Sequence, residues 1–221
     1  MRRLLLLLAL ITGFAVVPGA SPAMAAQKDP ILFVHGFSGG EFNWWQMQAR
    51  FNADGWNRAY NWSYNSGQSN VTTAYQIRDK VNAIKRETGA AKVDIISHSM
   101  GALGSRYYLK HLGGQYSVDD FVSIGGPNHG TNTAWACFTT SCGEMRPGSN
   151  FLNALNSGDE TPTNQSYVRY GTFWSWCDEI INPDESTPLS GAENNMVGCY
   201  GHLTLLGSWD VYTKVRSFVT Y

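Results

Sequence analysis

The sequence predicts an α/β domain in which a mostly parallel central sheet carries helices on both faces. Short apolar, β-branched runs alternate along the chain with segments of helical periodicity, as in doubly wound folds. Three of the runs, at 31–34, 93–96 and 118–124, end directly in turns rich in glycine, serine or histidine. Because ligands bind at the carboxyl ends of parallel strands, these turns indicate a site at one edge of the sheet.

The amino-terminal segment has the composition of a secretory signal peptide. An arginine pair at 2–3 precedes an apolar run at 4–17, and residues 23–25 read Ala-Met-Ala, which resembles a cleavage site. We expect cleavage after Ala25, which leaves 26–221 as a single domain without a separate cap domain. The apolar run is too short for a stable membrane span, and no later segment resembles one. The sequence therefore predicts a secreted, extracellular protein with no transmembrane span.

The charge balance argues against a nucleic-acid partner. The 221 residues include 16 Lys and Arg against 17 Asp and Glu, and loss of the arginine pair at 2–3 would leave a formal charge of −3. Nucleic-acid-binding domains normally carry a basic patch, which this sequence lacks. A charged content of 15% and an aromatic content of 13% instead fit a loop-rich secreted globule with apolar surface near a binding site. We expect this globule to be a monomer.

The first expected strand is the short apolar run at 31–34. The segment at 41–51 follows it and is expected to be helical. Its periodicity places Phe42 and Trp45 on one face and Trp44 off that face.

The middle of the chain contains the most regular patterns. An irregular strand is expected at 56–62, and the clearest helix spans 71–87, because its apolar residues recur at helical spacing. Strands are expected at 93–96 and 118–124, with a helix at 100–111 between them.

The carboxyl-terminal part is less periodic. Residues 131–166 form a long excursion rich in Asn, Thr, Ser and Gly, with a short helix expected around 151–156. Strands are expected at 167–176 and 195–197. A final helix is expected at 208–218, capped by the serine at its start.

The stretch at 92–101 has the layout of a nucleophile elbow, in which a strand, a sharp turn and a helix follow without a linker. Ser99 stands at the centre of its Ser-His-Ser-Met-Gly turn and is the candidate nucleophile. Ser97 replaces the first glycine of the G-x-S-x-G pattern, which is a departure, whereas Gly101 fits the second small position. The alternative is that Ser99 only caps the following helix.

A second turn could supply the oxyanion hole. The strand at 31–34 ends in His-Gly-Phe-Ser and two more glycines, and such a turn lets backbone amides point into a pocket. We expect the amides of Phe37 and Met100 to bind the oxyanion that develops in acyl transfer. The alternative is an ordinary glycine-rich turn between a strand and a helix.

The positions of five histidines leave one candidate base. His35 and His98 precede the nucleophile. His111 lies at a helix end, where the helix dipole explains it, and His129 comes too early to have an acid before it. His202 follows the last expected strand in a glycine-flanked loop, so it fits the chain order serine, acid, histidine.

The acid is expected to follow a strand that lies between the nucleophile and the base. Asp178 comes almost directly after the strand at 167–176. Its rivals are Glu179 beside it, Asp159 in the long excursion and Asp184 after a proline. Asp178 could also be a helix N-cap. A base needs such an orienting group before it can activate a serine hydroxyl.

Four cysteines in an exported chain indicate two disulfides, for which three pairings are possible. We favour Cys137 with Cys142 and Cys177 with Cys199, because the second bridge would join the segments that carry the candidate acid and base. The alternative, a zinc site of four cysteines, lacks the C-x-x-C spacing. The acidic residues show no cluster with calcium-binding spacing, so no metal is expected.

These motifs resemble those of the class 2 lipase family, small extracellular bacterial lipases of the α/β-hydrolase superfamily. The matching stretches occur in order along the chain, at 34–37, 97–101, 124–131, 178–181 and 201–203. The resemblance implies a minimal α/β-hydrolase fold, no cofactor and hydrolysis of carboxylic esters, with triacylglycerol the usual substrate. It also implies that Ser99 is the nucleophile, Asp178 the acid and His202 the base, with oxyanion donors at Phe37 and Met100.

The sequence departs from the smallest members of the family in its cysteines and in the excursion at 131–166. Both features bear on how open the site is, and therefore on whether the partner is lipid at a lipid–water interface or a soluble short-chain ester. A polyester depolymerase would use the same triad. A non-catalytic secreted binding protein on a hydrolase scaffold is the alternative from a different class.

Overall fold

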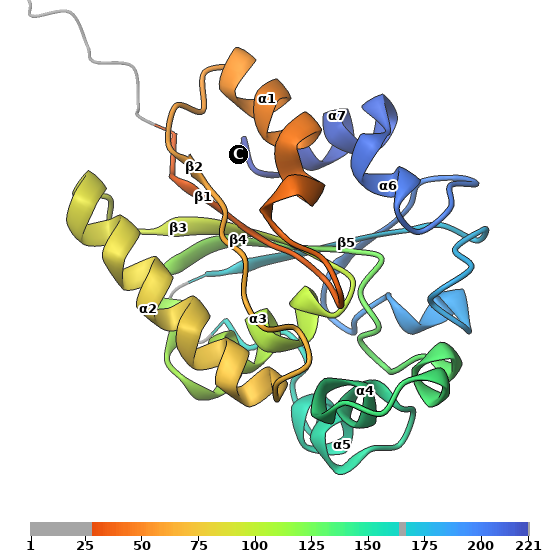
Figure 1. Ribbon diagram of the computed structural model, residues 1–221. Helices are drawn as coiled ribbons and strands as arrows, with labels where there is room; N and C mark the ends of the chain where they lie inside the picture. Colours follow the sequence, from red (N-terminus) through yellow and green to blue (C-terminus); the bar gives the residue numbers. More distant parts are fainter. Residues whose placement is uncertain (1–27, 164–166, 221) are drawn as a thin grey trace, which may run out of the picture.

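The computed structural model describes residues 28–163 and 167–220. In this part of the chain six strands form one sheet in the order β2-β1-β3-β4-β5-β6, and each neighbouring pair runs parallel (Figure 1). The predicted α/β class with a mostly parallel sheet is therefore confirmed. The expected leader lies outside the described residues. The strands are β1 Ile31–Val34, β2 Ala59–Tyr60, β3 Val93–His98, β4 Val118–Ile124, β5 Arg169–Trp174 and β6 Glu193–Met196.

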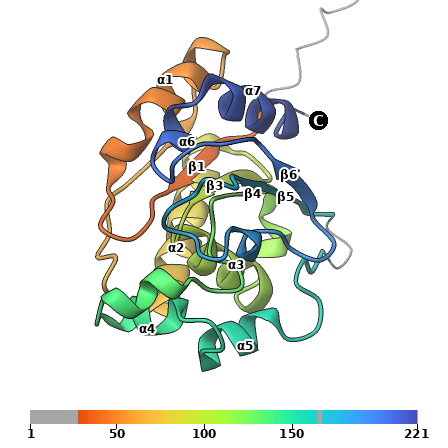
Figure 2. The same ribbon diagram turned by 90° about the vertical axis from the view of Figure 1, so that its right-hand side faces the viewer.

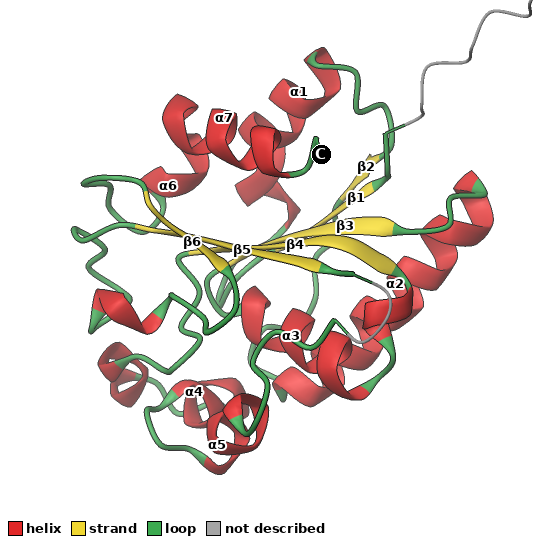
Figure 3. Cartoon of the chain, turned by 180° about the vertical axis from the view of Figure 1, so that it is seen from behind, coloured by secondary structure: helices red, strands yellow, loops and turns green. Residues whose placement is uncertain are grey.

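Helices cover both faces of the sheet, which Figures 2 and 3 show from two further sides. One face carries α1 Trp45–Ala53, α6 Thr204–Gly207 and α7 Trp209–Phe218. The other face carries α2 Asn70–Thr88 and α3 Gly101–His111. Two short helices, α4 Thr140–Met145 and α5 Asn150–Asn156, lie beyond α3 (Figure 2). None of the helices within 28–163 and 167–220 is both long and apolar enough to cross a membrane.

The burial of β1 explains why its sequence is uniformly apolar. Ile31 and Phe33 pack into the cluster beneath α1 and α7, whereas Leu32 and Val34 pack into the cluster beneath α2 and α3. Successive side chains of a strand point to opposite faces, so a strand covered on both faces needs apolar residues at every position. The strand β3 is also completely buried, and it is apolar at Val93, Ile95 and Ile96 but carries polar residues at 94, 97 and 98.

The helix expected at 41–51 forms, but a different face of it is buried. A 3-10 turn at Glu41–Trp44 precedes α1, and Trp44 is fully buried while Phe42 and Trp45 are 55% and 69% exposed. A 3-10 helix has about three residues per turn, so it changes the direction in which the following side chains point. The face predicted from a continuous α-helical period therefore differs from the one observed.

The excursion is more ordered than its sequence indicates. It contains a 3-10 helix at Asn132–Ala136, then α4 and α5, of which the sequence predicted only α5. The favoured cysteine pairing is confirmed, since Cys137 is bonded to Cys142 and Cys177 to Cys199. The first of these bridges closes the turn that leads into α4, which a search for periodic apolar residues cannot detect.

Charged side chains fasten the excursion to the neighbouring helices. The Glu144 carboxylate accepts hydrogen bonds from the Ser69 hydroxyl and the Asn70 amide, both at 2.6 Å, where α2 begins. A carboxylate is favourable there because the first amides of a helix lack partners and the helix dipole is positive. On α3, the Lys110 ammonium donates to the carbonyls of Leu155 and Asp159, both at 2.9 Å.

We predict that removing the Cys177–Cys199 bridge by a double serine substitution lowers the free energy of unfolding by about 3 kcal/mol, because the bridge closes a long loop. Removing Cys137–Cys142 should cost about 2 kcal/mol, since its partners are only 5 residues apart rather than 22. Urea denaturation followed by circular dichroism measures both. A larger loss for the shorter loop would contradict the loop-entropy account.

Candidate active site

The turn between β3 and α3 has the strained geometry of a nucleophile elbow. Ser99 has a φ of 55°, in the left-handed region that residues other than glycine rarely adopt. The N-cap position of helix α3 is Met100, which makes no side-chain capping bond, so Ser99 is not the N-cap. A Cβ atom on Gly101 would stand 2.5 Å from the carbonyl oxygen of His35 and 2.6 Å from that of Val34, so only glycine fits. The elbow therefore presses directly against the end of β1.

The departure at Ser97 has a structural partner. Its buried hydroxyl donates to the Ser105 hydroxyl at 3.0 Å, and Ser105 in turn donates to the Gly101 carbonyl at 2.8 Å. Buried hydroxyls need such partners because an unpaired one costs stability. The serine in place of the usual glycine thus links the strand to the first turn of α3.

The candidate acid and base are in direct contact. The Nδ1 atom of His202 lies 2.8 Å from the Oδ2 atom of Asp178, and both side chains are almost completely buried. A carboxylate only accepts hydrogen bonds, so Nδ1 carries the proton and Nε2 is left as the basic nitrogen. The Oδ1 atom of Asp178 accepts from the amides of Ile180 and Ile181 at 3.0 and 2.9 Å. One carboxylate therefore orients the imidazole and caps its own loop.

Two further side chains hold the backbone of His202. Its amide donates to the Oε2 atom of Glu179 at 2.9 Å, and its carbonyl accepts from the Nε2 atom of His98 at 3.1 Å. Burial, and then the nearby His202, hold the pKa of His98 well below its ordinary value of 6.5, so His98 is a neutral donor. The sequence offered Glu179 only as a rival acid and gave no sign that His98 contacts the candidate base.

The candidate residues gather at the carboxyl end of β4. The amide of Ser99 donates to the carbonyl of Ile124, the last residue of that strand, at 2.9 Å. A Cβ atom on the next residue, Gly125, would lie 3.1 Å from the Oδ2 atom of Asp178 and 3.4 Å from the Nδ1 atom of His202. The serine and the acid–base pair therefore lie against consecutive residues of one strand end.

The expected oxyanion turn lies beside Ser99. A Cβ atom on Gly36 would stand 2.6 Å from the Cβ atom of Ser99 and 3.1 Å from its hydroxyl oxygen, so the turn can approach the serine only because residue 36 is glycine. Among the described residues, no hydrogen bond engages the amide nitrogen of Phe37 or of Met100. Both amides are thus available as donors, as an oxyanion hole requires.

An apolar cavity of about 290 Å³ opens at Ser99. Its lining combines the oxyanion turn, the excursion and the loop of the candidate acid: Phe37, Ser99, Pro127, Thr131, Thr133, Ala134, Ala136, Cys137, Met145, Ile180 and Ile181. An apolar chamber next to a polar reacting centre suits a ligand with a hydrocarbon part and a single polar group. A cavity of about 330 Å³ near Trp56 is polar and adjoins none of these residues.

The amino ends of β1, β3 and β4, opposite the candidate site, hold an acidic cluster that the spacing of acidic residues in the sequence did not indicate. Carboxylate oxygens of Asp29, Asp94 and Asp119 lie within 4.8 Å of one another. The Lys92 ammonium contacts Asp119 at 2.8 Å. Burial and the neighbouring carboxylates raise the pKa of Asp94 well above its ordinary value, which favours its neutral form. The Lys92 ammonium offsets part of the negative charge of this cluster.

The buried histidines predict acid sensitivity. Burial lowers the pKa of His98 and of His35 below 6.5, whereas both titrate near that value when unfolded. Below this pH the unfolded chain binds more protons than the native one, so the free energy of unfolding falls as pH falls, by up to about 1.4 kcal/mol per pH unit for each histidine. Urea denaturation between pH 7.5 and 5.5 measures the slope. His98→Gln should make the free energy of unfolding depend less steeply on pH. An unchanged slope in this variant would contradict the lowered pKa of His98.

The chain matches the family model of the class 2 lipases over residues 28–197. A triacylglycerol lipase of Pseudomonas fragi is 30% identical over 69 residues, which cover 31% of this chain and 23% of that protein. The aligned part thus spans about a quarter of the length of that curated relative.

Solved structures show the same fold. Lipase BlEst2 of Bacillus licheniformis in its mature form superposes with a TM-score of 0.79 at 17% identity, covering 91% of this chain and 96% of that one. Lipase B of Aspergillus fumigatus superposes with a TM-score of 0.70 at 22% identity, covering 81% of this chain and 49% of that one. The chain therefore belongs to the class 2 lipase family and has the α/β-hydrolase fold.

Proposed function

We propose that the chain is a secreted serine ester hydrolase that cleaves triacylglycerol through an acyl-enzyme intermediate on Ser99. The observation that supports this most directly is the buried 2.8 Å contact between His202 and Asp178, at the strand end where Ser99 is held. Serine hydrolases need this combination, because a hydroxyl becomes nucleophilic only beside an oriented base. The apolar cavity at Ser99 supplies a place for an acyl chain.

Acylation begins with attack of the Ser99 hydroxyl oxygen on the ester carbonyl carbon, while Nε2 of His202 takes the hydroxyl proton. The negative charge of Asp178 stabilises the imidazolium that forms. The carbonyl oxygen becomes an oxyanion, which accepts hydrogen bonds from the amides of Phe37 and Met100. The tetrahedral intermediate collapses when the ester C–O bond breaks and His202 returns the proton to the leaving alcohol.

Deacylation repeats these roles with water. His202 takes a proton from a water molecule as its oxygen attacks the acyl carbon, and the same two amides stabilise the second oxyanion. Cleavage of the bond to Ser99 then releases the carboxylic acid, and the serine hydroxyl regains its proton from His202. The side chains supply every proton transfer in this scheme, so it needs no cofactor.

The cavity volume supports a second candidate substrate class. At about 290 Å³ the cavity lies at the lower end of the roughly 300–1,000 Å³ that ligand sites usually span. A short acyl chain fits this space, so a short-chain esterase with the same triad is the alternative. Hydrolysis rates on p-nitrophenyl esters of graded acyl length, compared with rates on triacylglycerol, distinguish the two.

Two disulfides support the proposal that the protein is secreted. Both bridges join cysteines of the described chain, and structural disulfides persist mainly in oxidising compartments. Fractionation of the producing cells, with detection of the mature chain in the medium, tests secretion. The residue at its amino terminus tests cleavage after Ala25.

We predict that Ser99→Ala and His202→Ala each lower ester hydrolysis by at least about a thousandfold, because each removes a member of the acid–base–nucleophile unit. Both variants should melt within a few degrees of the parent. His111→Ala is the matched control, since this histidine lies at the exposed end of α3, and it should retain full activity.

An alkyl phosphonate provides a direct readout of the nucleophile. The parent should form a covalent adduct on Ser99, which mass spectrometry of peptides locates, and Ser99→Ala should form none. A parent that neither hydrolyses esters nor reacts would indicate the binding-protein alternative. Activity retained without Ser99 would contradict the triad.

A further inference from the structure

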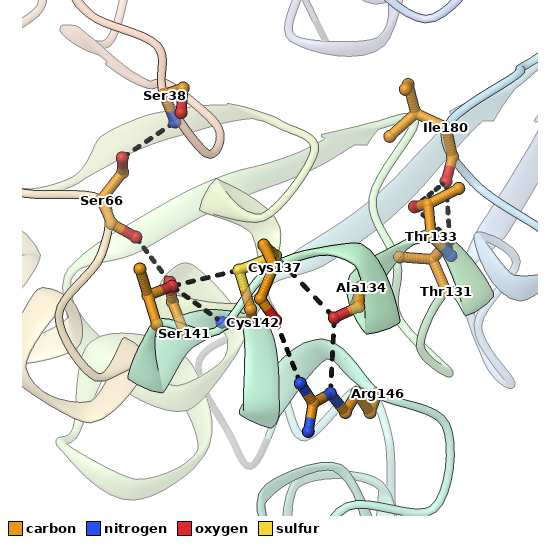
Figure 4. Close-up of a disulfide and its surroundings, with 11 residues drawn as sticks. Ser38, Ser66, Thr131, Thr133, Ala134, Cys137, Ser141, Cys142, Arg146 and Ile180 are labelled. Atoms are coloured by element: carbon orange, nitrogen blue, oxygen red, sulfur yellow. Dashed lines mark hydrogen bonds between the residues drawn. A yellow bond between two sulfur atoms is a disulfide. The ribbon is translucent and has the colours of Figure 1, made fainter.

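The oxyanion turn, residues 35–38, is held in a conformation that its own sequence does not favour. Ser38 has a φ of 54°, in the left-handed region that residues other than glycine rarely adopt. The amide of Ser38 donates to the hydroxyl oxygen of Ser66 at 2.9 Å (Figure 4). Ser38 directly follows Phe37, whose amide is the proposed oxyanion donor. The Ser66 hydroxyl therefore holds the residue next to that donor.

The segment of Ser66 also holds the other end of the turn. Two residues earlier, the Tyr64 amide donates to Nε2 of His35 at 3.2 Å, and the Tyr64 hydroxyl donates to the His35 carbonyl at 2.5 Å. The two rings stack with centroids 4.0 Å apart. Burial lowers the pKa of His35, which keeps its Nε2 free to accept. We call residues 64–66 the clamp loop, because they bond both ends of the oxyanion turn.

Helix α4 fixes the clamp loop in turn. The buried hydroxyl of Ser141 donates to the carbonyl oxygen of Ser66 at 2.7 Å, as Figure 4 shows. Ser141 precedes Cys142, whose disulfide partner Cys137 lines the cavity. The guanidinium of Arg146 donates to the Cys137 carbonyl at 3.0 Å. A continuous series of bonds thus connects the apolar wall of the cavity to the oxyanion turn.

We propose that Ser66 and Ser141 are positioning residues that hold the Phe37 amide where the oxyanion develops. This inference rests on the proposed function, because it concerns the same reacting centre. Without the Ser66 hydroxyl, the Ser38 amide loses its acceptor and the left-handed residue loses a bond that keeps it there. The Phe37 amide then moves relative to Ser99. Such a shift weakens binding of the transition state more than binding of the substrate.

The first experiment compares Ser66→Ala with Ser63→Ala on a soluble ester, p-nitrophenyl butyrate. Ser63 is a matched control because its hydroxyl also accepts a backbone amide, that of Glu41 at 3.1 Å, away from the oxyanion donor. Loss of a whole oxyanion donor costs about 10²–10³ in kcat, so we expect a displaced donor in Ser66→Ala to cost about tenfold. KM should stay within about twofold, since the acyl cavity is unchanged. Ser63→Ala should match the parent.

A trifluoromethyl ketone gives a readout that a purely structural role would not change. Its hemiketal with Ser99 carries an oxyanion, so its affinity should fall in Ser66→Ala by about the same factor as kcat. Ser66→Thr keeps a hydroxyl at this position and should restore both values. The melting temperature of each variant should stay within a few degrees of that of the parent, which checks that the variants remain folded.

A double-mutant cycle tests the contribution of Ser141. Ser141→Ala should lower kcat by about threefold, and adding it to Ser66→Ala should cost less than the product of the single effects, since both act on one donor. Fully multiplicative effects would remove Ser141 from the proposal.

The outcomes separate this proposal from the proposed function. An active parent whose activity depends on Ser99, but whose Ser66→Ala variant equals Ser63→Ala in kcat and ketone affinity, would overturn the positioning role alone. A parent without Ser99-dependent ester cleavage would overturn both.

Discussion

The close crossing of the nucleophile elbow over the end of β1 is the constraint on which the site depends. No side-chain atom fits at Gly101, because a Cβ would stand 2.5 Å from the His35 carbonyl oxygen. The crossing brings Ser99 beside Gly36, and so places the serine next to the turn that carries one of the two free amides. Strain at Ser99 is the consequence, and the packed strands on either side of β3 sustain it.

The proposed base and the proposed acid, His202 and Asp178, reach this point from the last third of the chain, where regular structure is sparse. The Cys177–Cys199 bridge joins the two loops next to Asp178 and His202, and Glu179 and His98 hold the backbone of the histidine. Covalent and polar contacts here take the place of secondary structure. Preorganisation of this kind matters because a catalytic hydrogen bond must already have the correct geometry when the substrate arrives.

The sequence predicted those parts whose signals are local. The β3 strand, the elbow and the helices at 71–87 and 208–218 each carry their pattern within one stretch, and the order of the motifs led to Asp178 and His202. The prediction of which face of the first helix is buried was wrong, because a 3-10 turn before α1 changes the direction in which the side chains point. Helix α4 and the contact of His98 with His202 depend on residues far apart in the chain, for which one sequence carries no distance information.

The bond between Glu144 and the start of α2 bears on how a substrate enters. This carboxylate accepts from the first amide of a 19-residue helix, so moving α4 outward would leave that amide and the buried Asn70 side chain without their acceptor, although Ser69 would still cap the helix. The wall over the cavity is thus bonded to the folded body through the side chain of Glu144. Any movement of α4 away from the cavity would first have to break these bonds, and their loss opposes such an opening.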